Sequence, residues 1–252
     1  MIKLLRLATI FAFTASANMG YAQVQGIGNG EGWLLGVGVV GNYSGYDQAD
    51  YPVVTPFPYV AYEWENAQLG FDGFNYEFLS TGTLSLTGLL EPRYTFADPD
   101  DSPLFEGVER DTALELGIKA TYDLDAFYLE AQFLQDVSET HDGCETSVAA
   151  GIETEIGSLR VTAELGALFK SEDLNSYLYG VQNDEESPTL PAFSPDQSLQ
   201  PYIGINATLQ TGKTSAIVFF GRFERFSSDV QASPLIGKGG EGSLGLAYIK
   251  QF

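Results

Sequence analysis

The chain ends on a strand-like run whose last residue is aromatic. Leu244, Leu246, Tyr248 and Phe252 all stand at even positions, so in an extended strand they share one face. Bacterial outer-membrane barrels close their final strand with such an apolar face turned towards lipid. The feature predicts an all-β protein, an antiparallel transmembrane β-barrel. It also predicts that the barrel-assembly machinery recognises the strand that ends at Phe252.

The beginning of the chain predicts export. Lys3 and Arg6 form a charged region, residues 7–17 are mostly apolar, and Gly20-Tyr21-Ala22 supplies small residues around a cleavage site. The apolar stretch of about 11 residues suits a signal peptide and is shorter than the ~20 residues of a membrane-spanning helix. We therefore expect residues 1–22 to be a cleavable signal peptide. Residues 23–252 are expected to form a single barrel domain in the outer membrane of a Gram-negative cell.

The charge of the chain excludes one class of partner. Of the 12 basic residues, Lys3 and Arg6 leave with the predicted signal, so 10 basic residues face 34 acidic ones and the formal charge is −24. Such a chain is repelled by the phosphates of nucleic acids. We expect the carboxylates to lie mainly in a wet lumen and in solvated loops. The alternative is that some of them bind divalent cations or a basic partner surface.

Apolar and polar residues alternate with a period of two through most of the chain. The clearest case is 159–169, where six apolar residues at odd positions alternate with mainly polar or small ones. The expected strands are 33–40, 56–64, 67–78, 83–96, 112–122, 126–135, 146–156, 159–169, 200–210, 214–226 and 243–252. A soluble β-sandwich has the same period and is the alternative fold. The single cysteine, Cys144, excludes a disulfide within the chain, so closure of the sheet is the expected source of stability.

The connections between these segments predict ten to twelve strands but conflict in one place. Short turns are expected at 65–66, 123–125, 157–158 and 211–213, and long connections at 41–55, 97–111, 136–145, 171–199 and 227–242. Long loops of bacterial barrels face outward and short turns face the periplasm. The short gap at 80–82 would instead place the long 97–111 connection on the periplasmic side. Either one segment within 56–96 is not a spanning strand, or residues 175–181 form an extra one.

Several segments resemble the MipA/OmpV family of outer-membrane proteins. The similar segments near the start are Trp33–Val40, Tyr43–Asp47 and Pro56–Tyr62, and those nearer the end are Tyr179–Val181, Arg225–Asp229 and Ser233–Gly237. The resemblance runs over nearly the whole mature chain. Lys250 departs from it, because many barrels prefer an aromatic residue two positions before the end.

The resemblance implies a role in the cell envelope. A MipA-like barrel is expected to hold peptidoglycan-remodelling enzymes at the outer membrane, contacting a lytic transglycosylase and, through it, a bifunctional peptidoglycan synthase. Relatives in the family are also implicated in osmotic response, adhesion and antibiotic uptake. A surface adhesin is therefore a lesser alternative.

A small acid-lined pore is the main alternative function. The residues expected to face the lumen are Glu115, Lys119, Glu153, Glu155, Arg160 and Glu164. A barrel of ten to twelve strands is intermediate between filled and open ones, so the 171–199 connection could plug it.

The chain offers little material for catalysis or for metal binding. Ser138, His141 and Asp142 are the residue types of a hydrolase triad, but all three lie in one predicted loop, and His141 is expected to be an ordinary solvent-facing histidine. His141 and Cys144 supply only two ligands for a transition metal. We therefore predict no catalytic, cofactor-binding or metal-binding residues and no enzyme activity.

Two further segments resemble ligand-binding loops, but both are expected to be solvated or flexible segments without a ligand. An acidic loop carries Asp98, Asp100, Asp101, Glu106, Glu109 and Asp111. It lacks the ligand register of an EF-hand, so a solvated loop is expected, with calcium bridging to lipopolysaccharide phosphates as a hypothesis. The glycines of 26–32 are expected to form a flexible periplasmic lead rather than a phosphate loop.

Overall fold

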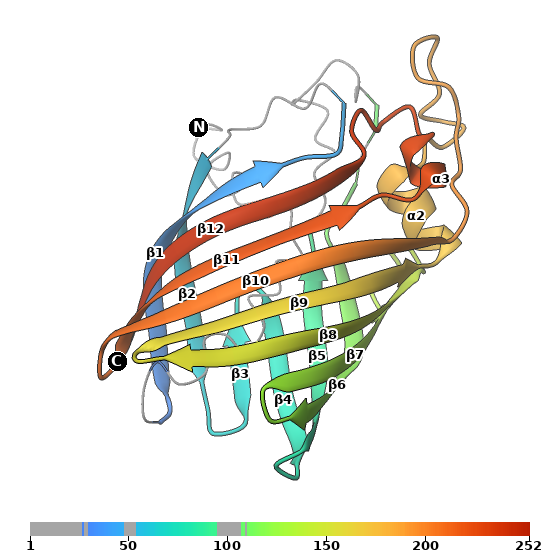
Figure 1. The fold of residues 1–252 in the computed structure, drawn as a ribbon. Helices are drawn as coiled ribbons and strands as arrows, with labels where there is room; N and C mark the ends of the chain where they lie inside the picture. The colour runs from blue at the N-terminus through green and yellow to red at the C-terminus, as the bar shows by residue number, and fades with distance from the viewer. Residues whose placement is uncertain (1–26, 28–29, 48–53, 95–106, 109) are drawn as a thin grey trace.

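The strands of the chain close into an antiparallel barrel in which β1 pairs with β12 and every other strand pairs with its neighbours in sequence (Figure 1). The structure is a computed structural model that describes residues 27, 30–47, 54–94, 107–108 and 110–252. Its twelve strands are β1 (Gly32–Tyr43), β2 (Val54–Glu63), β3 (Ala67–Gly70), β4 (Gly73–Ser80), β5 (Leu84–Arg93), β6 (Ala113–Leu124), β7 (Phe127–Asp136), β8 (Cys144–Ile156), β9 (Leu159–Lys170), β10 (Ser198–Gly212), β11 (Ser215–Arg225) and β12 (Gly240–Gln251). The predicted antiparallel barrel is confirmed, and its twelve strands lie within the predicted range of ten to twelve.

The apolar face of the strands points out of the barrel. Leu244 and Leu246 of β12 are 56% and 48% exposed, whereas Ala247 and Ile249 on the inner face are almost fully buried. The exposed apolar side chains continue around the other strands. A soluble sandwich would bury this face, so the sandwich alternative is wrong and the surface is one that lipid covers.

Inward-facing aromatic rings lie across glycines of the adjacent strand. Four directly paired positions show this arrangement: Phe57 with Gly38, Tyr128 with Gly151, Tyr202 with Gly166, and Phe220 with Gly245. A Cβ atom added at Gly151 would lie 2.2 Å from the Tyr128 ring. Each glycine therefore leaves the space that the neighbouring ring occupies, and the pair fixes the register of the two strands.

The conflict in the predicted connections arises from one segment. Residues 67–78, expected as a single strand, form a hairpin of β3 and β4 with its turn at Phe71 and Asp72. The extra strand restores the alternation, so that every long connection emerges at one end of the barrel and every short turn except that hairpin at the other. We call these the long-connection end and the short-turn end. Residues 175–181 are not an extra strand, because they lie mainly in helix α2 (Glu172–Tyr179).

The β3–β4 hairpin is too short to fill the wall. β2 pairs with β1 along 54–63 but with β3 only along 61–63, and β5 pairs with β4 no further than Leu90. The strand edges left without a strand partner among the described residues carry Pro56, Pro58 and Pro92. Proline suits such edges because it has no N–H to donate to a neighbouring strand.

Part of the barrel interior is apolar. Side chains of β1, β2, β11 and β12 pack against one another there, and Phe71 from the β3–β4 turn and Ile27 join them. The buried members of this cluster are Ile27, Leu34, Val40, Phe57, Tyr59, Ala61, Ala216, Val218, Phe220, Ala247 and Ile249. Neither α2 nor α3 (Ser228–Gln231) is long and apolar enough to cross a membrane.

Candidate functional site

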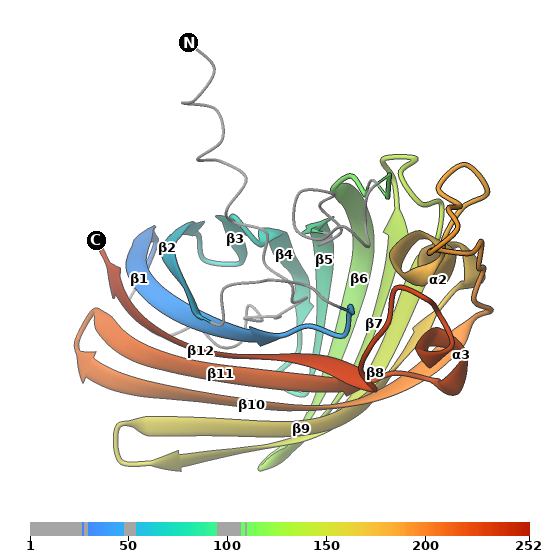
Figure 2. The same cartoon turned by 90° about the horizontal axis from the view of Figure 1, so that it is seen from above.

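The connections at the long-connection end fold together into a cap. Helices α2 and α3 lie beside each other there (Figures 1 and 2), and we define the cap as residues 44–47, 107–108, 110–112, 137–143, 171–197 and 226–239. Its own apolar core is built from Tyr46, Val108, Leu174, Tyr177, Leu178, Tyr179, Val181, Leu190, Phe226, Val230 and Leu235. The 171–199 connection thus has a packed structure that joins it to several other connections.

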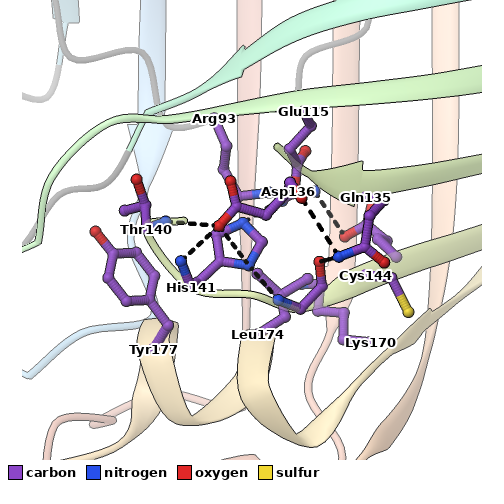
Figure 3. Close-up of polar contacts among 12 residues, drawn as sticks. Arg93, Glu115, Gln135, Asp136, Thr140, His141, Cys144, Lys170, Leu174 and Tyr177 are labelled. Carbon is purple, nitrogen blue, oxygen red and sulfur yellow. Dashed lines mark hydrogen bonds and ion pairs between the residues drawn. The ribbon is translucent and has the colours of Figure 1, made fainter. Parts of the chain in front are cut away.

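Asp136, at the end of β7, organises the β7–β8 connection. Its Oδ1 accepts hydrogen bonds from the backbone N–H and hydroxyl of Ser138 at 2.8 and 2.6 Å. Its Oδ2 accepts from the backbone N–H groups of Thr140, His141 and Asp142 at 2.8, 2.6 and 2.9 Å (Figure 3). One carboxylate therefore satisfies four backbone donors that the connection would otherwise leave unpaired.

His141 is buried, which contradicts the expected solvent-facing histidine. Its Nδ1 accepts a hydrogen bond from the Gly143 backbone N–H at 3.0 Å, so the ring proton lies on Nε2. Nε2 lies 3.2 Å from Glu115 Oε1 on the inner face of β6. Nε2 does not form a hydrogen bond with the described residues, so the ring contacts the barrel wall through its electrostatic interaction with Glu115.

The other residues of the considered triad have separate partners. The Ser138 hydroxyl donates to Asp136, and the same oxygen accepts the Leu114 N–H at 3.0 Å. Asp142 is exposed and has φ of 55°, a left-handed conformation that Asp tolerates. Among the described residues, therefore, no serine is hydrogen-bonded to His141 Nε2, and Ser138, His141 and Asp142 do not form a nucleophile–base pair. Cys144 is a free cysteine.

The β7–β8 connection lies tightly against the start of α2. The Ser171 hydroxyl caps the helix by accepting the Leu174 N–H, and it also accepts the Cys144 N–H at 2.9 Å. A Cβ atom at Gly143 would meet the Leu174 nitrogen at 2.5 Å. Only glycine allows this close approach, so the connection and the helix form one unit.

Buried ion pairs lie on the inner wall beneath the cap. Arg93 of β5 contacts Glu115 at 2.8 Å and Glu145 at 3.5 Å. Figure 3 shows Arg93, Glu115 and His141 close together. Because each buried charge is expensive without a partner, these side chains hold β5, β6 and β8 in a single arrangement.

A second buried pair ties α2 to β9 and β11. Lys170 of β9 contacts Glu224 of β11 at 2.6 Å and donates to the Tyr179 hydroxyl at 3.0 Å. Burial, reinforced by the Glu241 and Glu224 carboxylates, raises the pKa of Tyr179 well above its ordinary value. Tyr179, the last residue of α2, is therefore a neutral phenol. Its hydroxyl lies against the buried ion pair of Lys170 and Glu224.

Arg110 secures the other side of the cap. Its guanidinium forms a bidentate pair with Glu185 and donates to the carbonyl oxygens of Tyr177 and, at 2.9 Å, Gly180. These carbonyls belong to the C-terminal end of α2, where a cation is favourable. Both charged side chains are nearly fully buried, so the contact is a fixed part of the cap.

The residues predicted to line the lumen divide into two groups. Glu115 lies in the buried network, and Glu164 accepts a hydrogen bond from Tyr128 at 3.0 Å. Glu153, Glu155 and Arg160 are on the same inner face but lie at the short-turn end, where the salt bridge of Arg160 to Glu155 is solvent-exposed. Lys119 is on the inner face of β6 as predicted.

Some predicted features fall outside the described residues. They are the signal peptide 1–22 and, from the acidic loop, Asp98, Asp100, Asp101, Glu106 and Glu109. Asp111 is described, and its backbone oxygen accepts the Tyr177 hydroxyl at 2.5 Å. Among the described residues, no three His, Cys, Asp or Glu side chains are grouped so that they could hold a metal ion.

Sequence reasoning missed Asp136, Arg93, Arg110 and the pair of Lys170 and Glu224. A signal was available, because the chain has no basic residue between Arg6 and Arg93. In so acidic a protein, each rare basic residue in or beside a strand is a candidate for a buried ion pair. Asp136 gave no such signal, because it is one of 34 acidic residues and nothing in the sequence distinguishes it from the others.

Comparison with known proteins shows that the chain is similar to the members of one protein family. A family model described as "MltA-interacting protein MipA" matches residues 35–252. The "MltA-interacting protein" of Escherichia coli strain K12 is 28% identical over 257 residues, with 98% of each chain covered. "Outer membrane protein OmpV" of Vibrio cholerae is 23% identical over 251 residues, covering 97% of this chain and 96% of the relative. A solved outer-membrane channel of Pseudomonas putida F1 is 12% identical, with a TM-score of 0.43 and coverage of 92% and 98%.

Proposed function

The chain belongs to the MltA-interacting protein MipA family of outer-membrane barrels, and from this premise we propose that it is a scaffold that tethers peptidoglycan-remodelling enzymes to the outer membrane. The partner in direct contact is a lytic transglycosylase, through which a bifunctional peptidoglycan synthase is held. The protein acts by position, because tethering raises the effective concentration of the enzymes near their substrate.

The sorting of the connections is the observation that carries this proposal. The folded cap occupies one end of the barrel, and tight turns form most of the other. In bacterial outer-membrane barrels the short turns face the periplasm. The short-turn end is then the side on which a periplasmic enzyme can dock.

The exposed charges of the short-turn end favour a basic partner surface. The exposed acidic residues of its described part are Glu31, Glu65, Asp123, Asp125, Glu153 and Glu155, and the basic ones are Arg160, Lys213 and Lys250. Arg160 already pairs with Glu155. The remaining excess of carboxylates supports association with a complementary basic face, which speeds encounter and fixes orientation.

The interior gives the pore alternative less support. One side of the described interior is packed with apolar side chains, and charged groups on the other side are paired with one another. Conductance in a planar bilayer tests this alternative directly. A steady cation-selective current from the wild-type protein would favour transport over tethering.

The tethering proposal is tested by crosslinking in intact cells followed by recovery of the barrel and mass spectrometry of bound proteins. An unrelated barrel of similar size, expressed to the same level, sets the background. We expect lytic transglycosylases or peptidoglycan synthases to be enriched over that background. Their absence would overturn the proposal.

A pair of double variants locates the contact. Glu65→Lys with Asp123→Lys reverses charge at the short-turn end, whereas Asp184→Lys with Glu186→Lys makes the same change on exposed residues of the cap. The proposal expects the first variant to lose partner recovery and the second to keep it. Equal loss in both variants, with folded barrels, would contradict docking at the short-turn end.

A further inference from the structure

A cavity of about 810 Å³ opens on the cap, between the β7–β8 connection, α2 and the β9–β10 connection. Its floor, which we define as its apolar lining residues, includes buried Tyr177 and Val181 and half-buried Phe193. Its exposed lining includes Asp142 and Asp184. Nine of the thirteen lining residues are polar or charged, so the cavity joins a polar, partly acidic rim to a small apolar floor, a combination that suits an amphipathic small molecule.

The acidic rim has no cation of its own. Asp142, Asp173 and Asp184 line the cavity, and none of them forms an ion pair within the described part of the chain. No Lys or Arg is among the lining residues. Arg110 lies 5.5 Å from the Tyr177 ring, but its guanidinium is fully engaged by Glu185 and the carbonyls of α2. The cavity thus carries negative charge that the protein leaves unneutralised.

The floor of the cavity is fixed by the cap rather than by loose loops. Tyr177 is held by its hydroxyl contact to Asp111 and by the ring of His141 at 5.5 Å. Phe193 and Val181 form a two-residue antiparallel bridge with N–O distances of 2.8 and 3.0 Å. A preformed site loses little conformational entropy when a ligand binds.

We propose that this cavity binds a small soluble organic cation with apolar substituents, such as an alkylated ammonium ion. The carboxylates attract the charge of such a cation, and its alkyl groups cover the apolar floor. Because the Tyr177 ring already packs against Arg110 and His141, Phe193 supplies the aromatic contact. A bare metal ion fits less well, since no three ligand side chains of the described cavity are grouped closely enough to hold one. The site is at the opposite end from the proposed enzyme-docking turns. The binding proposal therefore does not depend on the tethering function, and failure of one leaves the other unaffected.

The test uses the full-length barrel in maltoside micelles, with choline as the probe and NMR titration as the readout. The neutral isostere 3,3-dimethyl-1-butanol has carbon in place of the quaternary nitrogen and serves as the ligand control. Asp142→Asn with Asp184→Asn removes two rim charges while keeping shape, and Asn suits the left-handed backbone at position 142. The matched protein control is Asp125→Asn, an exposed Asp with φ of 58° in a turn at the short-turn end.

The proposal predicts saturable choline binding that weakens with added salt, about tenfold weaker binding in the double variant, and no change in Asp125→Asn. The isostere should bind more weakly than choline to the wild type. Phe193→Leu, which keeps an apolar side chain in the floor, should also weaken choline binding. Equal binding of choline and the isostere, or unchanged binding in a folded double variant, would overturn the proposal.

Discussion

Among single residues, Asp136 has an effect out of proportion to its size, because five donors of the β7–β8 connection converge on its carboxylate. Asp136→Asn replaces one acceptor oxygen with a donor that faces backbone N–H groups. We expect the opening free energy of 138–142 to fall by about 2 kcal/mol, equivalent to roughly 30-fold faster amide exchange. Hydrogen exchange by mass spectrometry measures this directly.

Asp123→Asn is the control for this change. Asp123 is an exposed residue near the end of β6, and its carboxylate has no hydrogen-bond partner among the described residues. Its substitution should leave exchange in 138–142 unaltered. If Asp136→Asn behaved like Asp123→Asn, the carboxylate would not be what orders the connection.

Arg110 is expected to hold the cap through a different physical effect. Arg110→Gln leaves the Glu185 carboxylate buried without its partner, a change that costs about 3–5 kcal/mol when the charge stays buried. The C-terminal turn of α2 should then exchange faster and become sensitive to protease. Adding Glu185→Gln removes the orphan charge and should restore part of the protection. Failure of the second substitution to restore anything would argue against the ion pair as the cause.

Residue-level features were the least predictable from sequence. The acceptors and donors around Asp136 depend on how a seven-residue connection turns back on itself, which no periodic pattern encodes. The burial of His141 depends likewise on Glu115, 26 positions away in sequence. By contrast, the outward positions of Leu244, Leu246 and Tyr248 follow from a local period of two and were predicted correctly.

Among the strands, the pairs of an aromatic residue and a glycine lead to the most specific prediction about stability. Gly151→Ala places a methyl group where the Tyr128 ring lies, so we expect about 1–3 kcal/mol of destabilisation. In a Tyr128→Ala background the same methyl group has room and should cost much less. Urea unfolding in lipid vesicles gives the four free energies of this double-mutant cycle. Additive effects would show that the two residues do not pack as a pair.

The β3–β4 hairpin explains why the strand count could only be bracketed. Residues 67–78 alternate well enough to suggest one strand, and the turn at Phe71 and Asp72 is hidden because Phe71 packs into the barrel interior. A two-residue turn with one aromatic member lacks the usual Asn-Gly or Asp-Gly pair at its centre. Two warnings were present: Asp72 followed by Gly73 is a common turn pair, and a barrel of eleven strands could not place all the long connections at one end.

For the molecule as a whole, a substitution at the C-terminal residue should lower the efficiency of assembly in cells more than the stability of the folded barrel. The Phe252 ring is 67% exposed, so it contributes little to packing within the barrel. Phe252→Ala should lower the amount of folded barrel in the outer membrane several-fold if the assembly machinery reads this residue. Leu244→Ala, at an outward position within β12, should lower it less. Heat-modifiable migration on gels counts the folded fraction. Equal folding of both variants in cells would contradict a signal at Phe252.

The proposed tethering function depends on orientation, because it requires the short turns to face periplasmic enzymes and the cap to face away. Site-specific photocrosslinking in living cells tests it most directly, with the crosslinker at Asp125, Ser158 or Lys213 in short turns and at Asn183 or Lys238 in the cap. We predict crosslinks to a lytic transglycosylase from the short-turn positions and none from the cap. Crosslinks from the cap alone, or none from either end while the barrel is folded, would contradict the tethering function.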